Sequence, residues 1–290
     1  MIKMRFLFLL FAVLAVSGNA GAQSGIFGKK ENLRDISEKC LKVVTDNNSF
    51  FNLSLRDAVE KNWKLCDVDF CTMEQFEELK CDTSYYFLMK VDGVFKKERE
   101  PAMEFLSLLK GGPQAEVSIE NMYEVLTLPL NSIDDDGSSI VPYLGAYVNI
   151  IQTHILRVQK KKVAAVMGIS WYSNRLSEIG GMKLLLNEND LSKNVTAEQA
   201  EEILGPDGSV ENEDAVYEAI DSASENTLVS LCIAPQLGQQ GSYCYKMLIG
   251  TDSGELFYYR KQKITGKSPK GFLADDLKKI AVYLKQDTAL

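Results

Sequence analysis

The chain begins with a segment that has the features of an export signal. Lys3 and Arg5 precede an unbroken apolar run over residues 6–16, and the small residues Ala20-Gly21-Ala22 follow it. A positive start, a short apolar stretch and an Ala-x-Ala pattern are typical of a cleaved signal peptide. Because the run is shorter than the roughly 20 residues of a membrane-spanning helix, we expect cleavage after Ala22 and no remaining transmembrane anchor. The sequence therefore predicts a periplasmic or secreted protein that folds in an oxidising compartment.

The six cysteines all lie after this signal segment. An even number of cysteines in an exported chain indicates a disulfide framework. The bridges we predict are Cys40–Cys66, Cys71–Cys81 and Cys232–Cys244. A metal site that uses the second, third and fourth of these cysteines is the alternative, but it lacks a Cys-x-x-Cys pair and a nearby fourth ligand.

A diffuse repeat organises the rest of the chain. Two runs, one near Asp57 and one near Asp214, each contain an amphipathic helix, an apolar strand that ends at a cysteine, an aromatic strand, a returning strand and a closing helix. We therefore predict an α+β fold in which two disulfide-clipped α-β-β-β-α modules flank a mainly helical middle segment. The predicted boundaries are 1–22 for the signal peptide, 23–30 for a flexible lead-in, 31–112 for the first module, 113–195 for the middle segment and 196–290 for the second module.

Three further expectations concern single elements. The closing helices of the two modules should cover residues 101–110 and 272–284. In the middle segment, apolar residues from Ile140 to Val158 recur at helical spacing and predict a long helix. Residues 163–172 fit a strand and a helix equally well.

The formal net charge of −8 is unfavourable for nucleic-acid binding, in which lysines and arginines meet phosphates. Acidic residues gather in 178–225 and basic residues near the C-terminal end, which indicates two solvated faces. The alternative is a basic surface that docks an acidic protein partner. Its binding residues would be Tyr259, Arg260 and Lys261 on a predicted strand. Aromatic residues of the same hairpin fit the core or, alternatively, a peptide- or glycan-binding face.

Histidine-dependent catalysis has little support. The one histidine of the chain, His154, borders the apolar face of the predicted long helix, as a packing residue does. There is no Gly-x-Ser-x-Gly elbow for a serine nucleophile, and a cysteine nucleophile would need a thiol outside the disulfide framework. We therefore predict no catalytic residue and leave open whether the chain has enzymatic activity.

Three acidic clusters match known sites only in part. Residues 67–69 (Asp-Val-Asp) have the spacing of a phosphate-transfer motif but lie between two cysteines instead of ending an apolar strand. Residues 134–137 indicate a solvated turn. Residues 207–218 have the oxygen spacing of a calcium-binding loop, but Asn212 stands where that loop needs glycine. We predict no metal site and no cofactor.

The function we expect is that of an exported, non-catalytic interaction module that docks a protein partner in the envelope or the extracellular space. One alternative is a hydrolase that depends on carboxylates. The other is a carrier that holds a small apolar ligand in a groove beside the helix of residues 140–158.

Overall fold

The computed structural model describes residues 33–45, 49–93, 102–160, 169–236 and 241–285. The predicted signal peptide and lead-in lie outside the described residues, as do residues 163–168 of the stretch that fits a strand or a helix. Residues 169–174 form a helix. None of the helices in the described ranges is long and apolar enough to cross a membrane.

The first unit of the fold is built around a five-stranded sheet. Its elements are β1 (Cys40–Val44), α2 (Phe50–Asn62), β2 (Asp67–Cys71), α3 (Met73–Leu79), β3 (Tyr85–Gly93), β4 (Met103–Lys110), β5 (Tyr123–Ser132) and α4 (Leu144–Lys160). The strands lie in the order β2-β1-β3-β4-β5. β1 runs parallel to β2 and β3, and the pairs β3–β4 and β4–β5 are antiparallel.

The second unit repeats this arrangement after the short helix α6 (Ile169–Asn174). Its elements are β6 (Lys183–Asn187), α7 (Ala197–Leu204), β7 (Gly208–Glu211), α8 (Glu213–Asp221), β8 (Thr227–Ile233), β9 (Tyr243–Gly250), β10 (Leu256–Lys263) and α9 (Ala274–Leu284). The strand order is β10-β9-β8-β6-β7. β6 is parallel to β7 and β8, and the remaining pairs are antiparallel.

Short 3-10 turns connect several of these elements. They are η1 (Ile36–Glu38), η2 (Pro113–Glu116), η3 (Ile119–Asn121), η4 (Val141–Tyr143), η5 (Arg175–Glu178), η6 (Glu188–Asp190) and η7 (Gly205–Asp207). η2 and η3 lie between β4 and β5, where they place Ala115 and Met122 against Phe76 and Phe87. This segment and α3 therefore cover the outer face of the first sheet.

Both units thus follow the order β-α-β-α-β-β-β-α, and the predicted mixed α+β class is confirmed. The equivalences differ from the predicted ones. Sequence similarity matched the helix around Asp57, which is α2, with the helix around Asp214, which is α8. By strand order α2 corresponds to α7, and α3 corresponds to α8. The predicted repeat is displaced by one strand because similar helix-then-strand patterns occur twice within each unit.

Two other predictions about elements are wrong. The expected helix over 101–110 is β4, an interior strand of the sheet, whose Met103–Lys110 run has five apolar residues in eight because both faces of an interior strand are largely buried. Residues 113–195 are not a separate helical segment, since β5 completes the first sheet and β6 belongs to the second. The long helix and the closing helix near the C-terminus are confirmed as α4 and α9.

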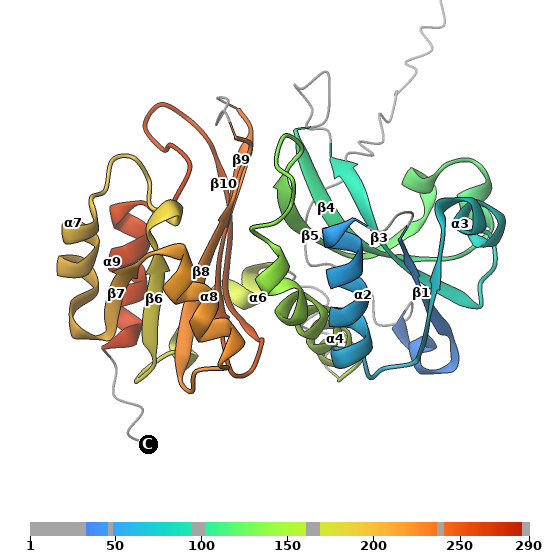
Figure 1. The fold of residues 1–290 in the computed structure, drawn as a ribbon, viewed down its shortest axis with the longest axis horizontal. Helices are drawn as coiled ribbons and strands as arrows, with labels where there is room; N and C mark the ends of the chain where they lie inside the picture. The colour runs from blue at the N-terminus through green and yellow to red at the C-terminus, as the bar shows by residue number, and fades with distance from the viewer. Residues whose placement is uncertain (1–32, 46–48, 94–101, 161–168, 237–240, 286–290) are drawn as a thin grey trace, which may run out of the picture.

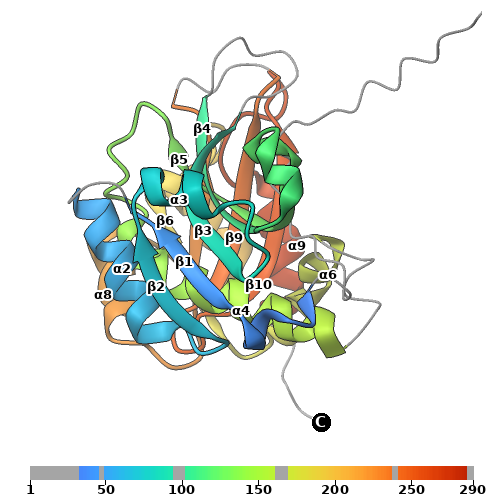
Figure 2. The ribbon, with the colours of Figure 1, turned by 90° about the vertical axis from the view of Figure 1, so that its right-hand side faces the viewer.

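The two units stack in the same direction (Figure 1). α2 and α4 pack side by side between the sheets, and α7 and α9 pack in the same way beyond the second sheet. Figure 2, turned by 90°, shows the first unit in front of the second. The largest apolar core fills the space between the sheets and includes Tyr147, Ile151, Val229 and Tyr245.

The predicted disulfide clips are not formed in this structure, in which all six cysteines are free thiols. Each sheet is held instead by its strand ladder and by the cores on its faces. Two of the predicted pairs do lie near one another. Cys40 pairs in the ladder with Asp67, the residue after Cys66, and the thiols of Cys232 and Cys244 are hydrogen-bonded.

Candidate functional site

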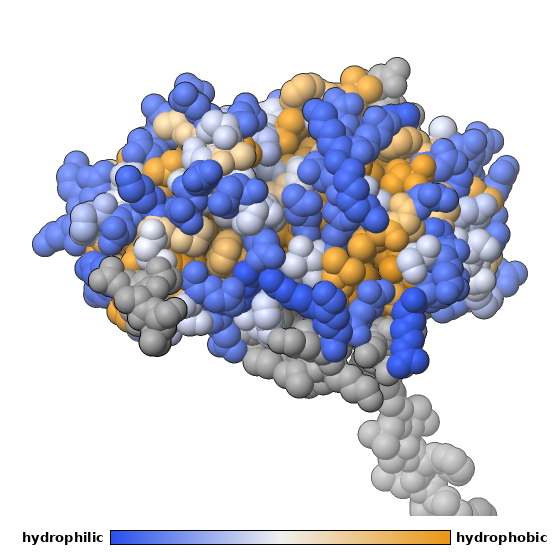
Figure 3. All heavy atoms as spheres, turned by 90° about the horizontal axis from the view of Figure 1, so that it is seen from below, coloured by the Kyte–Doolittle hydropathy of each residue, from blue (hydrophilic) through white to orange (hydrophobic). Residues whose placement is uncertain are grey.

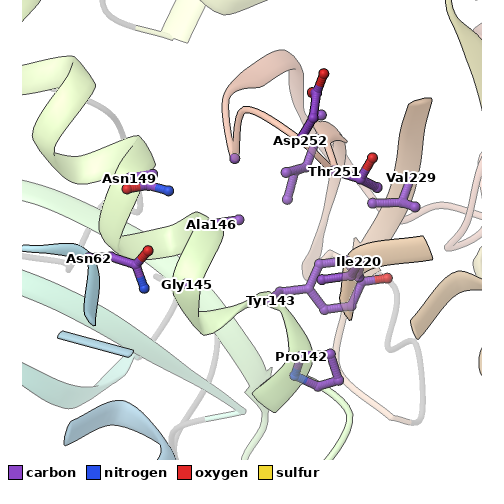
Figure 4. Close-up of a pocket in the computed structure, with 13 residues that line it drawn as sticks. Asn62, Pro142, Tyr143, Gly145, Ala146, Asn149, Ile220, Val229, Thr251 and Asp252 are labelled. Atoms are coloured by element: carbon purple, nitrogen blue, oxygen red, sulfur yellow. The ribbon is translucent and has the colours of Figure 1, made fainter. Parts of the chain in front are cut away.

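A cavity of about 220 Å³ opens at the seam between the two units (Figure 4). The first unit supplies one wall, with Asn62 at the end of α2 and residues 142–149 around the start of α4. The second unit supplies the opposite wall, with Ile220 of α8, strands β8 and β9, and the turn that follows β9. Figure 3 views the molecule from below, the side on which this turn lies, and shows apolar residues at the surface between charged ones.

Hydrogen bonds fix the first wall. The Asn62 Nδ2 donates to the Ala58 carbonyl oxygen at 2.8 Å, and the Asn62 carbonyl oxygen accepts from the Gln152 Nε2 at 2.8 Å. The Gln152 Oε1 in turn accepts from the Lys64 backbone N–H at 2.6 Å. The buried amide of α4 thus satisfies the end of α2, and the two helices hold the wall as one piece.

The second wall comes unusually close to α4. Gly254 has φ +60, and a Cβ there would lie 2.7 Å from the Asn149 Nδ2 and 3.4 Å from the Ala146 Cα. Glycine adopts this left-handed conformation without steric cost, and its lack of a side chain permits the approach. The sequence signal for this contact is the Asp-Ser-Gly turn between β9 and β10.

The cavity combines an apolar floor with amide groups on its wall. Ile220, Val229 and Ile249 supply apolar surface, and the Tyr143 hydroxyl donates to the Ser230 carbonyl oxygen at 3.0 Å. Figure 4 shows the amides of Asn62 and Asn149 directed towards the cavity and the carboxylate of Asp252 directed away from it. Such a lining can take an apolar group and pair with polar groups beside it.

The residues of the predicted basic surface are not gathered on one face. Tyr259 is fully buried in the core between the sheets. Arg260 lies on the other face of β10, where it forms an ion pair with Asp276. The Lys261 ammonium lies 4.4 Å from the centre of the Tyr243 ring, and burial lowers the pKa of Lys261. Alternate residues of a strand point to opposite faces, so three consecutive residues cannot share one surface.

A buried charge pair lies next to Arg260. Lys246 of β9 and Asp276 of α9 are both fully buried, with 2.5 Å between Nζ and Oδ2. The Lys246 Nζ also donates to the Gln262 Oε1 at 2.7 Å, and Asp276 accepts from the Leu273 N–H at 3.0 Å. The sequence reasoning missed this pair, although a lysine inside the apolar run of β9 was a usable signal.

The prediction that His154 is a packing residue is confirmed. Its side chain is buried, and its Nδ1 lies 3.1 Å from the Tyr172 hydroxyl. Burial, with a smaller contribution from the Arg157 charge, lowers the pKa of His154 to about 3. The imidazole is therefore neutral at physiological pH.

The acidic clusters are accounted for by local structure. Asp67 and Asp69 lie on strand β2, where Asp69 forms an ion pair with Lys42 at 2.5 Å. The stretch 207–218 is not a loop, because it contains β7 and the start of α8. Asn212 caps that helix by accepting from the Ala215 N–H at 2.9 Å.

Within the described part of the chain, no three His, Cys, Asp or Glu side chains gather as a metal site would require. The seam cavity is the candidate functional site of this chain. Comparisons with protein-family models, with curated proteins and with solved structures found no match to this chain.

Proposed function

We propose that the chain is an exported, non-catalytic interaction module that binds a protein partner at the seam cavity. The observation that carries this proposal is the size of the cavity together with its lining. A volume of about 220 Å³ accommodates one large side chain, whereas sites for drug-sized ligands typically occupy about 300–1,000 Å³. An apolar pocket that receives a single anchor residue is characteristic of protein–protein hot spots.

The partner that fits this lining is an extended segment with one apolar anchor side chain. Ile220, Val229 and Ile249 would surround the anchor. Beside it, the amides of Asn62 and Asn149 offer both donors and acceptors, which match the N–H and C=O groups of an extended backbone. A rigid wall favours this binding mode, because little side-chain conformational freedom is lost on association.

Two alternatives have less support from the same geometry. A carboxylate-dependent hydrolase needs two carboxyl groups that face each other across the substrate. Among the described residues that line the cavity, Asp252 supplies a carboxylate, and this group accepts from the Asn226 N–H at 3.3 Å. A carrier for an apolar ligand needs a larger and more uniformly apolar hollow than this one.

Export is part of the same proposal. The signal pattern that ends at Ala22 supports residence in the periplasm or the extracellular space, where the partner would be another exported protein. The oxidising compartment would also permit the cysteines to pair, with Cys232–Cys244 and Cys40–Cys66 as the pairs that the fold brings near one another.

The test is selection of a displayed library of extended peptides on the mature protein, followed by affinity measurement with variants. Ala146→Trp fills the cavity, and Ala197→Trp is the matched control on α7, since both alanines are half-buried and near the start of a helix. We expect selected peptides to share an apolar anchor, to bind the control normally and to bind Ala146→Trp at least about tenfold more weakly. Asn149→Leu keeps the branched shape and the number of side-chain heavy atoms but removes the amide, so it should weaken the same peptides.

Peptides that bind equally well to the wild type and to Ala146→Trp would refute the proposed site. A circular dichroism melt of each variant shows whether the fold is retained. If Ala146→Trp does not fold, the comparison of Asn149→Leu with the wild type decides.

A further inference from the structure

We infer that Cys232 and Cys244 form a redox-active pair in the folded protein, with thiol–disulfide exchange entering at Cys232 and completed by Cys244. The exchange partner is a molecule that carries a reactive disulfide. This inference does not depend on the seam cavity, because both cysteines lie within the second unit.

The strand register places the two thiols on the same face of the second sheet. Cys232 of β8 pairs in the ladder with Lys246 of β9, and Cys244 precedes that lysine by two residues. Residues two apart on a strand share a face, so Cys232 and Cys244 are diagonal neighbours. Their thiols are hydrogen-bonded to one another, which shows that the two sulfur atoms are already close.

The surroundings of the two thiols differ. Cys244 is fully buried, whereas Cys232 is partly exposed at the end of β8. The hydrogen bond from Cys232, the nearby Lys246 ammonium and the Gly271 N–H lower the pKa of Cys244 to about 7. The same hydrogen bond, burial and the charge of Asp190 raise the pKa of Cys232. The shared proton therefore stays on Cys232, and Cys244 has the thiolate character that exchange requires.

Two exchange steps follow from this asymmetry. In the first, the Cys232 proton passes along the hydrogen bond to the Cys244 thiolate, and the resulting Cys232 thiolate attacks the disulfide of the oxidant. A bond forms between Cys232 and one oxidant sulfur, the oxidant S–S bond breaks, and the departing thiolate takes the proton from Cys244. In the second step, the Cys244 thiolate attacks the Cys232 sulfur, and the remaining oxidant sulfur leaves as a thiolate that takes up a proton. The net reaction oxidises two thiols to one disulfide and reduces the oxidant disulfide to two thiols.

The other pair that the fold brings near one another does not share this arrangement. Burial raises the pKa of both Cys40 and Cys66. The Cys66 sulfur accepts from the Trp63 Nε1 at 3.4 Å. The Lys42 charge near Cys40 and a backbone hydrogen bond from Leu41 to Cys66 act in the opposite direction, but burial outweighs them. Cys40 and Cys66 thus provide a comparison pair in the same molecule in which both pKa values are raised.

The experiment treats the reduced mature protein with oxidised glutathione and follows it by intact mass and non-reducing peptide mapping. We expect the wild type to form the Cys232–Cys244 crosslink and to retain no glutathione on either residue. Cys244→Ser should keep one glutathione on Cys232, because the second step is blocked. Cys232→Ser should be modified at Cys244 at least about tenfold more slowly, because that thiol is buried.

Cys40→Ser is the matched control and should leave formation of the crosslink unchanged. Wild-type protein that keeps glutathione on Cys232, that forms no crosslink, or that joins either cysteine to one of the other four would overturn the inference. Equal labelling of Cys244 in Cys232→Ser and of Cys232 in Cys244→Ser would overturn the proposed order of entry. The wild-type crosslink is measured directly, so the test of the pair does not depend on how well the variants fold. Circular dichroism melts of Cys232→Ser and Cys244→Ser show whether both retain the fold that the test of the order of entry requires.

Discussion

Removal of Lys246 from its buried pair with Asp276 should be among the most destabilising single changes in this protein. Both side chains are fully inaccessible to solvent, so an ionised Asp276 that loses its partner cannot be solvated by water. Breaking a buried ion pair by removing one partner typically costs about 3–5 kcal/mol of unfolding free energy. The size of the loss for this pair depends on the partners that each charge keeps after the other residue is replaced.

In Lys246→Met, Asp276 keeps the Arg260 guanidinium and the Leu273 N–H. We therefore expect a loss at the low end of that range, about 3 kcal/mol. In Asp276→Asn, the Lys246 ammonium keeps neutral acceptors, the Gln262 Oε1 and the new amide oxygen, but loses its counter-charge. The start of α9 also loses a charged cap, so we expect about 4 kcal/mol.

The assay is urea unfolding at pH 7, followed by circular dichroism and tryptophan fluorescence, on the two single variants and the double variant. Each single change leaves the other buried charge without its partner, so both single losses include the penalty for an unpaired charge. The double variant removes both charges and should therefore lose at least about 2 kcal/mol less unfolding free energy than the sum of the two single losses. Lys278→Met is the control on the same helix, where the pair with Asp275 is exposed and 3.7 Å long. It should cost less than about 0.5 kcal/mol. A loss below about 1 kcal/mol for Lys246→Met, or strict additivity, would refute the reasoning.

Three further predictions concern pH, the seam and export. Burial raises the pKa of Asp190 to about 6 from an ordinary value of 3.8, so the folded state favours the protonated acid. The wild type should therefore lose about 2 kcal/mol of unfolding free energy relative to Asp190→Asn as pH rises from about 4 to 6. Urea unfolding midpoints across this range check the loss, and a constant difference between the two proteins would contradict it. Gly254→Ala should cost about 1–2 kcal/mol more unfolding free energy than the control Gly137→Ala. Gly137 has a similar positive φ, but no atom lies nearer than 3.7 Å to a Cβ placed there. Equal losses in thermal unfolding would count against the close contact at the seam. Intact-mass measurement of the exported protein should give a chain that begins at Gln23, and a retained apolar segment would exclude the proposed processing.

The helical parts of the fold were the most predictable. The long helix expected between Ile140 and Val158 is α4, and the closing helix expected over 272–284 is α9. Both carry apolar residues at helical spacing over several turns, a pattern that strands do not produce. Met103–Lys110 was misassigned because an apolar run without clear spacing fits a buried helix and a central strand alike.

The candidate site was out of reach of the same reasoning. Asn62 and Gly254 meet at one cavity although most of the chain lies between them, and neither belongs to a recognisable motif. Tyr259 looked like a surface aromatic because strand alternation permits either face, and the packing of α4 on the second sheet decided that its face is the core.

The α+β class, the apolar faces of the long helices and a recurring helix-then-strand pattern could all be read from the amino-acid sequence. These properties are local, since they depend on the period of apolar residues and on turn chemistry within short windows. Tertiary structure alone decided which strands pair, and with that the true equivalence of the two units and the meeting of Cys232 with Cys244. It also decided that Lys246 and Asp276 share one buried site. Strand order and the burial of a charge depend on contacts between residues far apart in the chain, and no local pattern encodes the partner of such a contact.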